Sequence, residues 1–190
     1  IGTWNGQFRD DIRSFWKGDK NSTWKLKDHL EGNPDLYMGS DNKMMRSINF
    51  ITAHDGFTLN DLVSFNCKHN LGNGEDNRDG ENHNNSWNHG VEGPTTNQEL
   101  IFLRARQRKN LISTLLLSPG VPMISMGDEV GRSQGGNNNT WCQNNLLSWM
   151  IWDLNTSDTD LHSFIVKLLK FRKDFPELFN PKILDSEVSI

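Results

Sequence analysis

The sequence predicts an α/β fold built on a parallel sheet, because two short apolar segments flank a long helical segment and each ends in polar residues. The first segment, residues 47–53, runs into His54 and Asp55, and the second, residues 121–126, runs into residues 127–129, Gly-Asp-Glu. This order of strand, helix and strand is typical of a βαβ unit. Because parallel strands end on one edge of a sheet, we expect both polar ends there, where a ligand would bind.

Composition narrows the class of protein. The chain has 190 residues, 34% of them hydrophobic, and a formal net charge of −4. This amount of apolar sequence supports one core. The absence of a Lys/Arg-rich block argues against a nucleic-acid partner. No apolar run approaches the roughly 20 residues of a membrane helix, which argues against a membrane partner.

The two cysteines indicate a cellular compartment, and the start of the chain indicates whether it is a fragment. Cys67 and Cys142 match no metal or redox spacing, which predicts free thiols in a reducing compartment and leaves a disulfide open. We therefore expect the cytoplasm, or the plastid stroma in a plant. The chain begins on Ile1 without an initiator Met, so we also expect it to be a piece of a longer protein.

The segment before the first strand predicts helical structure. Apolar residues at i, i+4, i+7 and i+8 mark a helix over residues 7–16, which Gly18 ends, and residues 9, 10, 11 and 13 are expected on its solvated face. Mixed residues follow as far as residue 46, with a short helix at residues 24–30.

After the first strand, apolar spacing predicts a helix of two or three turns that begins near Thr58 or Asn60. The alternative to a functional His54 and Asp55 is structural: Asp55 would cap this helix and His54 would be an ordinary turn residue. Both interpretations stay open on this segment alone.

Residues 68–96 form a long polar loop, rich in Asn, Gly, Asp, Glu and His. Long loops in compact domains are often binding loops. Residues 75–80 imitate the start of an EF-hand, but the twelfth position is Ser86 instead of Glu, and His83 and His89 have no standard zinc spacing, so no metal is predicted. Amides, carboxylates and a Trp suit sugars, which offer hydroxyls and flat apolar ring faces.

The long helix is expected to begin at a capping box of Thr96 and Glu99 and to run to about Leu117. Four basic residues at 104–109 are interpreted as a solvated face, with phosphate binding as the alternative. A second amide-rich loop covers residues 135–139. Ser157 with Asp160 opens a last helix, and residues 183–190 are expected to start a new strand.

Several motifs together resemble the isoamylase-type debranching enzymes of glycogen and starch, within the α-amylase superfamily. Residues 50–56, Phe-Ile-Thr-Ala-His-Asp-Gly, resemble the superfamily segment in which a strand ends in His-Asp. The other matching motifs are Trp4-Asn5-Gly6, Phe8-Arg9-Asp10, Phe57-Thr58-Leu59, Asn73-Gly74-Glu75, Asn77-Arg78-Asp79-Gly80, Gly127-Asp128-Glu129, Gly136-Asn137-Asn138-Asn139, Trp149 and Trp152-Asp153.

The resemblance implies a fold. Residues 1–180 would form the C-terminal part of a (β/α)8 TIM barrel, about units six to eight, and residues 181–190 would start a C-terminal β-sandwich domain. It implies no cofactor and no metal.

The resemblance also implies retaining hydrolysis of α-1,6-glucosidic branch points in a branched α-glucan such as glycogen, amylopectin or limit dextrin. Such enzymes use two carboxyl groups about 5 Å apart. Asp55 would be a third carboxylate that stabilises the transition state. His54, Asp128 and Asn137 would bind substrate. No segment here resembles those that carry the nucleophile and the acid, so we expect the fragment alone to be inactive.

Two other classes of function stay open. One is a non-catalytic glucan-binding subunit with the same fold, and the other is an α/β binding module for a different polar ligand. The intact His54-Asp55 pair argues against the non-catalytic subunit, and binding assays on branched and linear glucans separate the module from the others.

Overall fold

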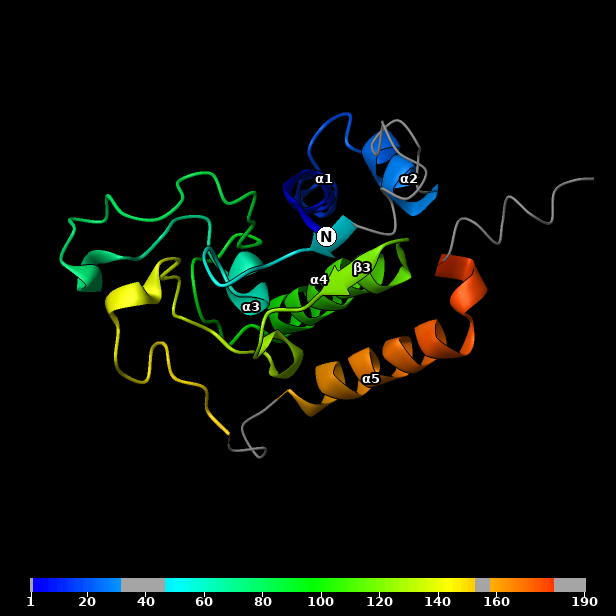
Figure 1. The fold of residues 1–190 in the computed structure, drawn as a ribbon. Coiled ribbons are helices and arrows are strands. Elements are labelled where there is room, and N and C mark those ends of the chain that lie inside the picture. Colours follow the sequence, from blue (N-terminus) through cyan, green and yellow to red (C-terminus); the bar gives the residue numbers. More distant parts are fainter. Residues whose placement is uncertain (1, 32–46, 153–157, 180–190) are drawn as a thin grey trace, which may run out of the picture. The chain divides into compact units, whose positions relative to one another are not determined.

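The structure is a computed structural model that describes residues 2–31, 47–152 and 158–179 (Figure 1). It divides the chain into two compact units. The first comprises Ile1–Ile51, Asn110–Met123 and Phe164–Ile190, and the second comprises Thr52–Lys109 and Ile124–Ser163. The first unit holds the sheet, and the second holds the predicted site residues.

The sheet of the first unit has the strand order β1-β2-β3, with β1 at Thr3–Asn5, β2 at Ser47–Phe50 and β3 at Val121–Met123. Both pairs are parallel, and Ile48 faces Trp4 on one side and Val121 on the other. The predicted parallel pairing of the two apolar segments is confirmed, although both strands end about three residues earlier than expected. Strand β1 was not predicted.

A buried polar residue links β1, β2 and the segment that leads into β3. Asn49 of β2 is 1% exposed and donates from Nδ2 to the Pro119 carbonyl, 2.7 Å away, just before β3. Its Oδ1 accepts from Ser47 Oγ at 2.8 Å and from Asn5 Nδ2 at 3.3 Å. A buried amide with all these partners satisfied fixes the register of the strands.

Helix α1, Gly6–Lys17, is the predicted first helix, and α2, Thr23–Glu31, is the predicted short one. The Asn5 side chain caps α1 by accepting from the Phe8 backbone N–H, and Gly18 ends it with φ 88°. The solvated face predicted for α1 is wrong at two positions. Asp11 is buried beside His29 and Lys25, and Arg13 is buried with Nε and Nη2 donating to the Ile51 carbonyl.

The long helix α4, Gln98–Leu117, and the last helix α5, Thr159–Asp174, occur where the sequence predicted them. Their caps differ from those predicted. The Asn97 side chain accepts from the Leu100 N–H at 3.2 Å, and the Asp158 side chain accepts from the Leu161 N–H at 2.9 Å. The interpretation of Ser157 lies outside the described residues, as does the new strand at residues 183–190.

Apart from the first half of α4 and the start of α5, little regular structure occurs in the second unit. It contains α3 at Leu59–Leu62 and short 3-10 turns at Leu71–Asn73, Asp128–Val130 and Thr140–Cys142. Helix α3 begins where expected but has one turn, not two or three. In Figure 1 the long green loop after α3 runs beside the yellow segment that follows β3. In the part of the chain that the structure describes, no helix is long and apolar enough to cross a membrane.

The buried Arg13 yields a test of the sheet. The guanidinium of Arg13 donates two hydrogen bonds to the Ile51 carbonyl. In the full-length parent protein, Arg13→Lys keeps the positive charge but cannot donate both bonds in this planar geometry. Loss of one charge-assisted bond costs about 1.5 to 3 kcal/mol, so amide exchange in residues 47–51 should accelerate about 10- to 100-fold. Hydrogen-exchange mass spectrometry measures this. Arg78→Lys, at an exposed arginine that pairs with Asp76, is the control, and equal acceleration in both variants contradicts the assignment.

Candidate functional site

His54 and Asp55 are exposed on the segment that joins β2 to α3. The helix cap is a different residue: Thr58 Oγ1 accepts from the Asp61 N–H at 3.1 Å. The interpretation of Asp55 as the cap of this helix is therefore wrong. Both His54 and Asp55 therefore lie at the surface of the second unit, where a ligand can reach them.

Asp128 holds the segment that carries this pair. Its Oδ2 accepts from Thr52 Oγ1, and its Oδ1 accepts from the Leu59 N–H at 2.9 Å. Thr52 and Leu59 lie on either side of His54 and Asp55 in the sequence, so one carboxylate fastens both flanks of the pair. The polar ends that follow β2 and β3 therefore meet, as predicted from the parallel strands.

The Asp128 carboxylate is 1% exposed. Burial raises its pKa to about 6, against the lowering effect of the Thr52 and Leu59 donors. Holding a charge here at neutral pH costs free energy. Asn137 is also 1% exposed, with its Nδ2 donating to Asn73 Oδ1 at 2.8 Å. Two of the three predicted substrate-binding residues, Asp128 and Asn137, are thus engaged inside the protein, whereas the third, His54, is exposed beside Asp55.

Asp61 of α3 is a site residue that the sequence analysis missed. It is fully buried, and it accepts from Ser133 Oγ at 2.5 Å and from the backbone N–H groups of Gln134 at 2.7 Å and Gly136 at 3.4 Å. Burial raises the pKa of this carboxyl group above its usual range. Thr58 with Asp61 is a Thr-x-x-Asp pattern, a local signal for a cap, but nothing local indicates the partners some 70 residues away.

The two amide-rich loops bond to each other through a network of side chains. Asn138 Nδ2 donates to Asn84 Oδ1 at 3.0 Å, and Asn70 Nδ2 donates to Asn138 Oδ1 at 2.9 Å. Asp79 Oδ2 accepts from Asn73 Nδ2 at 2.7 Å and Asn139 Nδ2 at 2.9 Å. The Asn73 and Asn139 amides lower the pKa of Asp79 below its usual range. The network holds residues 70–84 against residues 137–139.

This network corrects the interpretation of the amides. They were expected to meet sugar hydroxyls, yet the buried members, Asn70, Asn84 and Asn138, bond to one another and to the backbone. Close approach demands glycine here: Gly80 has φ 71°, and a Cβ would lie 2.3 Å from Asn138 Oδ1. Among the described residues, no three His, Cys, Asp or Glu side chains converge as metal ligands would, and Cys67 and Cys142 are free and exposed.

Two of the four basic residues in the stretch of α4, Arg104 and Arg108, do not belong to a solvated face, whereas Arg106 is exposed as predicted. Arg104 is 6% exposed, and its Nη1 donates to the Gly93 carbonyl at 2.6 Å while its Nη2 donates to the carbonyls of Asn88 and Val91. Arg108 pairs with Asp158 at 2.8 Å. These side chains tie the end of the polar loop and the start of α5 to the helix, so neither earlier interpretation of the basic residues holds for Arg104 and Arg108.

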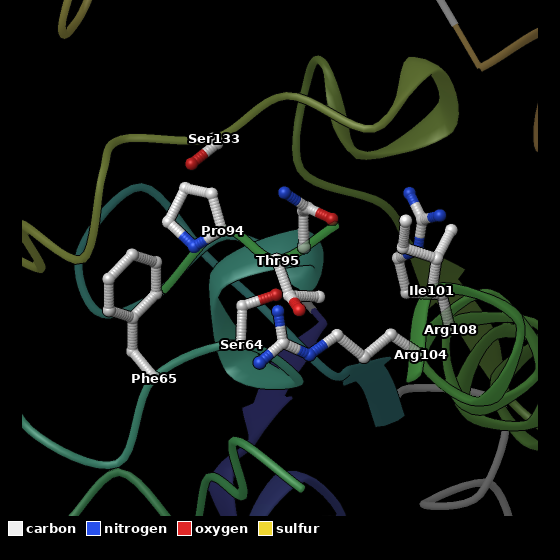
Figure 2. A pocket seen from close by; sticks show the side chains of 9 residues that line it. Ser64, Phe65, Pro94, Thr95, Ile101, Arg104, Arg108 and Ser133 are labelled. Atoms are coloured by element: carbon white, nitrogen blue, oxygen red, sulfur yellow. The ribbon is translucent and has the colours of Figure 1, made fainter. Parts of the chain in front are cut away.

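A cavity of about 270 Å³ lies in the second unit between α3 and the first half of α4 (Figure 2). Figure 2 shows the Arg104 side chain reaching toward Ser64 along its floor, with Phe65 and Pro94 on one side. Its lining residues are Asn60, Ser64, Phe65, Pro94, Thr95, Ile101, Arg104, Arg108 and Ser133. None of the four predicted site residues lines it, so the cavity is separate from the His54-Asp55 pair.

Asp61 yields a test of how the two loops are joined. In the full-length parent protein, Asp61→Asn removes the charge that Ser133, Gln134 and Gly136 donate to. Charged acceptors make the stronger bonds, worth about 1.5 to 3 kcal/mol each. Amide exchange in residues 133–137 should accelerate at least about 10-fold by hydrogen-exchange mass spectrometry. The control is the exposed Asp76→Asn, and unchanged exchange in Asp61→Asn contradicts the role.

Glu92 yields a pH test. Partial burial acts to raise its pKa, but bonds from the Asn66 N–H, His69, the Cys67 N–H and Asn88 outweigh burial and lower the pKa to about 2. A lowered acid pKa stabilises the fold above the ordinary value near 4.5, and this stabilisation is lost as pH falls toward 2.

Exchange protection of residues 66–69 in the parent protein should therefore decline between about pH 4.5 and pH 2 relative to residues 47–50. Glu92→Gln should start less protected and lose this part of the pH dependence. Pulse-labelling exchange at several pH values measures both. A wild-type decline that persists unchanged in Glu92→Gln assigns the transition to another group.

No family model matches the chain, but several known proteins are similar to it. The Mycobacterium bovis protein named glycogen operon protein GlgX homolog is 52% identical over 90% of this chain and 24% of its own length. Isoamylase SU1, chloroplastic, from Zea mays is 48% identical over 92% of this chain and 22% of its length. A glycogen debranching enzyme from Serratia proteamaculans is 45% identical over 92% of this chain and 26% of its own length.

Solved structures agree on the mixed α/β fold. A pullulanase from Bacillus acidopullulyticus matches with TM-score 0.66 at 18% identity, covering 94% of this chain and 19% of that one. A type I pullulanase from Bacillus subtilis, complexed with maltose, matches with TM-score 0.64 at 21% identity, covering 94% of this chain and 22% of that one.

The chain spans about a quarter of the length of the curated relatives it matches. Its similarity to them covers nine-tenths of its own residues. The chain is therefore a homologue of one segment of the isoamylase-type glycogen debranching proteins, as the sequence motifs predicted.

Proposed function

We propose that this chain is part of a glycoside hydrolase that cleaves α-1,6-glucosidic branch points of glycogen or starch with a retaining mechanism. Its substrate is a branched α-glucan, and the chain contributes one side of the site. The relatives named glycogen debranching enzyme and isoamylase support this reaction. They also favour the bacterial cytoplasm or the plastid stroma as the location.

One observation supports the role of the site most directly. His54 and Asp55 are exposed, while the backbone on both sides is fastened to the buried Asp128 by Thr52 and Leu59. An exposed carboxylate on a restrained segment loses little conformational entropy when it binds a ligand. This combination favours a contact with substrate over a purely structural role.

Asp55 then acts as the transition-state stabiliser. Its carboxylate accepts hydrogen bonds from hydroxyls of the sugar at the cleaved bond, and these bonds strengthen as the ring gains positive charge. His54 donates to a neighbouring hydroxyl. The nucleophile and the general acid come from other parts of the parent protein, about 5 Å apart in a retaining enzyme.

The substrate-binding roles of Asp128 and Asn137 stay predictions. Their burial favours an indirect role, in which Asp128 positions the His54-Asp55 segment and Asn137 joins the two amide-rich loops. A retained charge at Asp128 gives stronger bonds to Thr52 and Leu59 than a neutral amide would.

We further propose that residues 1–180 form the C-terminal part of a (β/α)8 barrel and that residues 181–190 begin a C-terminal β domain. The parallel strands β1, β2 and β3, with α4 between β2 and β3, support this arrangement. Active sites of such barrels lie where the strands end, which is where His54 and Asp55 follow β2.

Asp55→Asn in the full-length parent protein tests the catalytic role. The variant keeps the shape of the side chain but loses the charge, so turnover on a branched glucan should fall far more than affinity. By analogy with removal of one preorganised transition-state contact, the loss is about 100- to 1000-fold, or about 3 to 4 kcal/mol. Steady-state kinetics measure it, with circular dichroism to verify folding.

The matched comparison is His54→Ala, which should cost less because a neutral donor makes the weaker bond. A folded Asp55→Asn enzyme that keeps more than about a tenth of wild-type turnover removes Asp55 from the transition state. A parent protein without an Asp and a Glu at the ends of its fourth and fifth barrel strands would instead be a non-catalytic glucan-binding subunit.

A further inference from the structure

The segment from Ser133 to Trp152 contains no charged residue, although 23% of the whole chain is charged. It contains amides, hydroxyls and three tryptophans instead. Its polar end toward Ser133 is bonded into the second unit by Asp61. A surface of this composition does not attract ions and suits a neutral ligand that combines hydroxyls with apolar faces.

Two tryptophans of this segment are exposed on restrained backbone. Trp141 is 74% exposed in the 3-10 turn Thr140–Cys142. On one side of it, Gln134 Nε2 donates to Thr140 Oγ1 at 2.9 Å. On the other side, Gln143 Nε2 donates to the Gly72 carbonyl and to Asn73 Oδ1, both at 2.8 Å. The turn that presents Trp141 is therefore attached to the amide network.

Trp149 is held in a similar way. It is 52% exposed, yet its indole Nε1 donates to Asn144 Oδ1 at 3.0 Å and its backbone N–H donates to the Asn145 carbonyl at 3.0 Å. Ser148 Oγ donates to the Gln143 carbonyl, which closes the loop between the two tryptophans. The indole is thus oriented by the protein while half of its surface faces solvent.

Exposing the apolar surface of an indole to water is unfavourable, and restraining it there does not stabilise the surface in the absence of a ligand. A pyranose ring presents a flat apolar face of C–H groups with hydroxyls around its edge. Indoles match the face, and the surrounding amides match the hydroxyls. A charged peptide or a nucleic acid would find no complementary charge between Ser133 and Trp152.

We propose that Trp141 and Trp149 form an aromatic platform that stacks against glucose rings of a bound α-glucan chain, in addition to the contacts of the His54-Asp55 pair. The identity of the glucan rests on the proposed function, but the platform is defined by its own residues. It contributes affinity for the polymer. The bonded Trp149 indole and the restrained turn that carries Trp141 reduce the conformational freedom lost on binding.

The test uses the full-length parent protein and measures its dissociation constant for glycogen by affinity electrophoresis. Trp141→Ala and Trp149→Ala should each weaken binding about two- to tenfold, the fold-change that corresponds to one aromatic contact. Trp141→Phe, which keeps a flat ring, should restore most of the binding. The matched control is Phe102→Ala, which removes an aromatic residue that is 70% exposed on α4 outside the segment.

Each outcome decides the matter. Unchanged binding in both Trp→Ala variants overturns the platform, and so does an equal loss in Phe102→Ala or a failure of Trp141→Phe to recover binding. Hydrolysis of a branched glucan by the wild-type parent is measured in parallel. If hydrolysis is absent while the Trp variants still lose glycogen binding, the proposed hydrolase function fails and the platform stands.

Discussion

The buried carboxylate of Asp128 is the constraint on which the second unit depends. It accepts from Thr52 on one side of the His54-Asp55 pair and from Leu59 at the start of α3 on the other. Its pKa of about 6 reflects the cost of keeping a charge away from water. That cost is offset by stronger bonds to two donors, which fix the geometry of an exposed segment.

Polar bonds replace an apolar core in much of this unit. Residues 68–96 have few large apolar side chains, and they keep their conformation because Asn70, Asn84 and Asn138 satisfy one another inside the protein. Each amide is both donor and acceptor, so such a network fits only one arrangement of the two loops. The buried Asp61 and Arg104 extend the same principle to Ser133 and to the carbonyl of Gly93.

These internal bonds determine which residues remain available for a ligand. His54, Asp55, Trp141 and Trp149 have exposed side chains, whereas Asp128 and Asn137 do not. In the proposed function, the carboxylate and the imidazole meet sugar hydroxyls and the two indoles meet sugar ring faces. Rigid support beneath exposed groups reduces the entropy lost on binding.

The sequence by itself determined the main helices, the parallel pairing of β2 with β3 and the family. Apolar spacing located α1, α4 and α5, and the polar ends of the two predicted strands located the site, because these signals are local and depend only on the period of each element. The ordered motifs identified the relatives. Only the tertiary structure decided that Thr58 caps α3, that Arg13 and Arg104 are buried, and that Asp61 receives bonds from Gln134. The sequence does not show whether a charged or amide side chain faces water or bonds to a carbonyl that the fold brings close. The role of such a side chain depends on partners distant in the sequence, which no local pattern specifies.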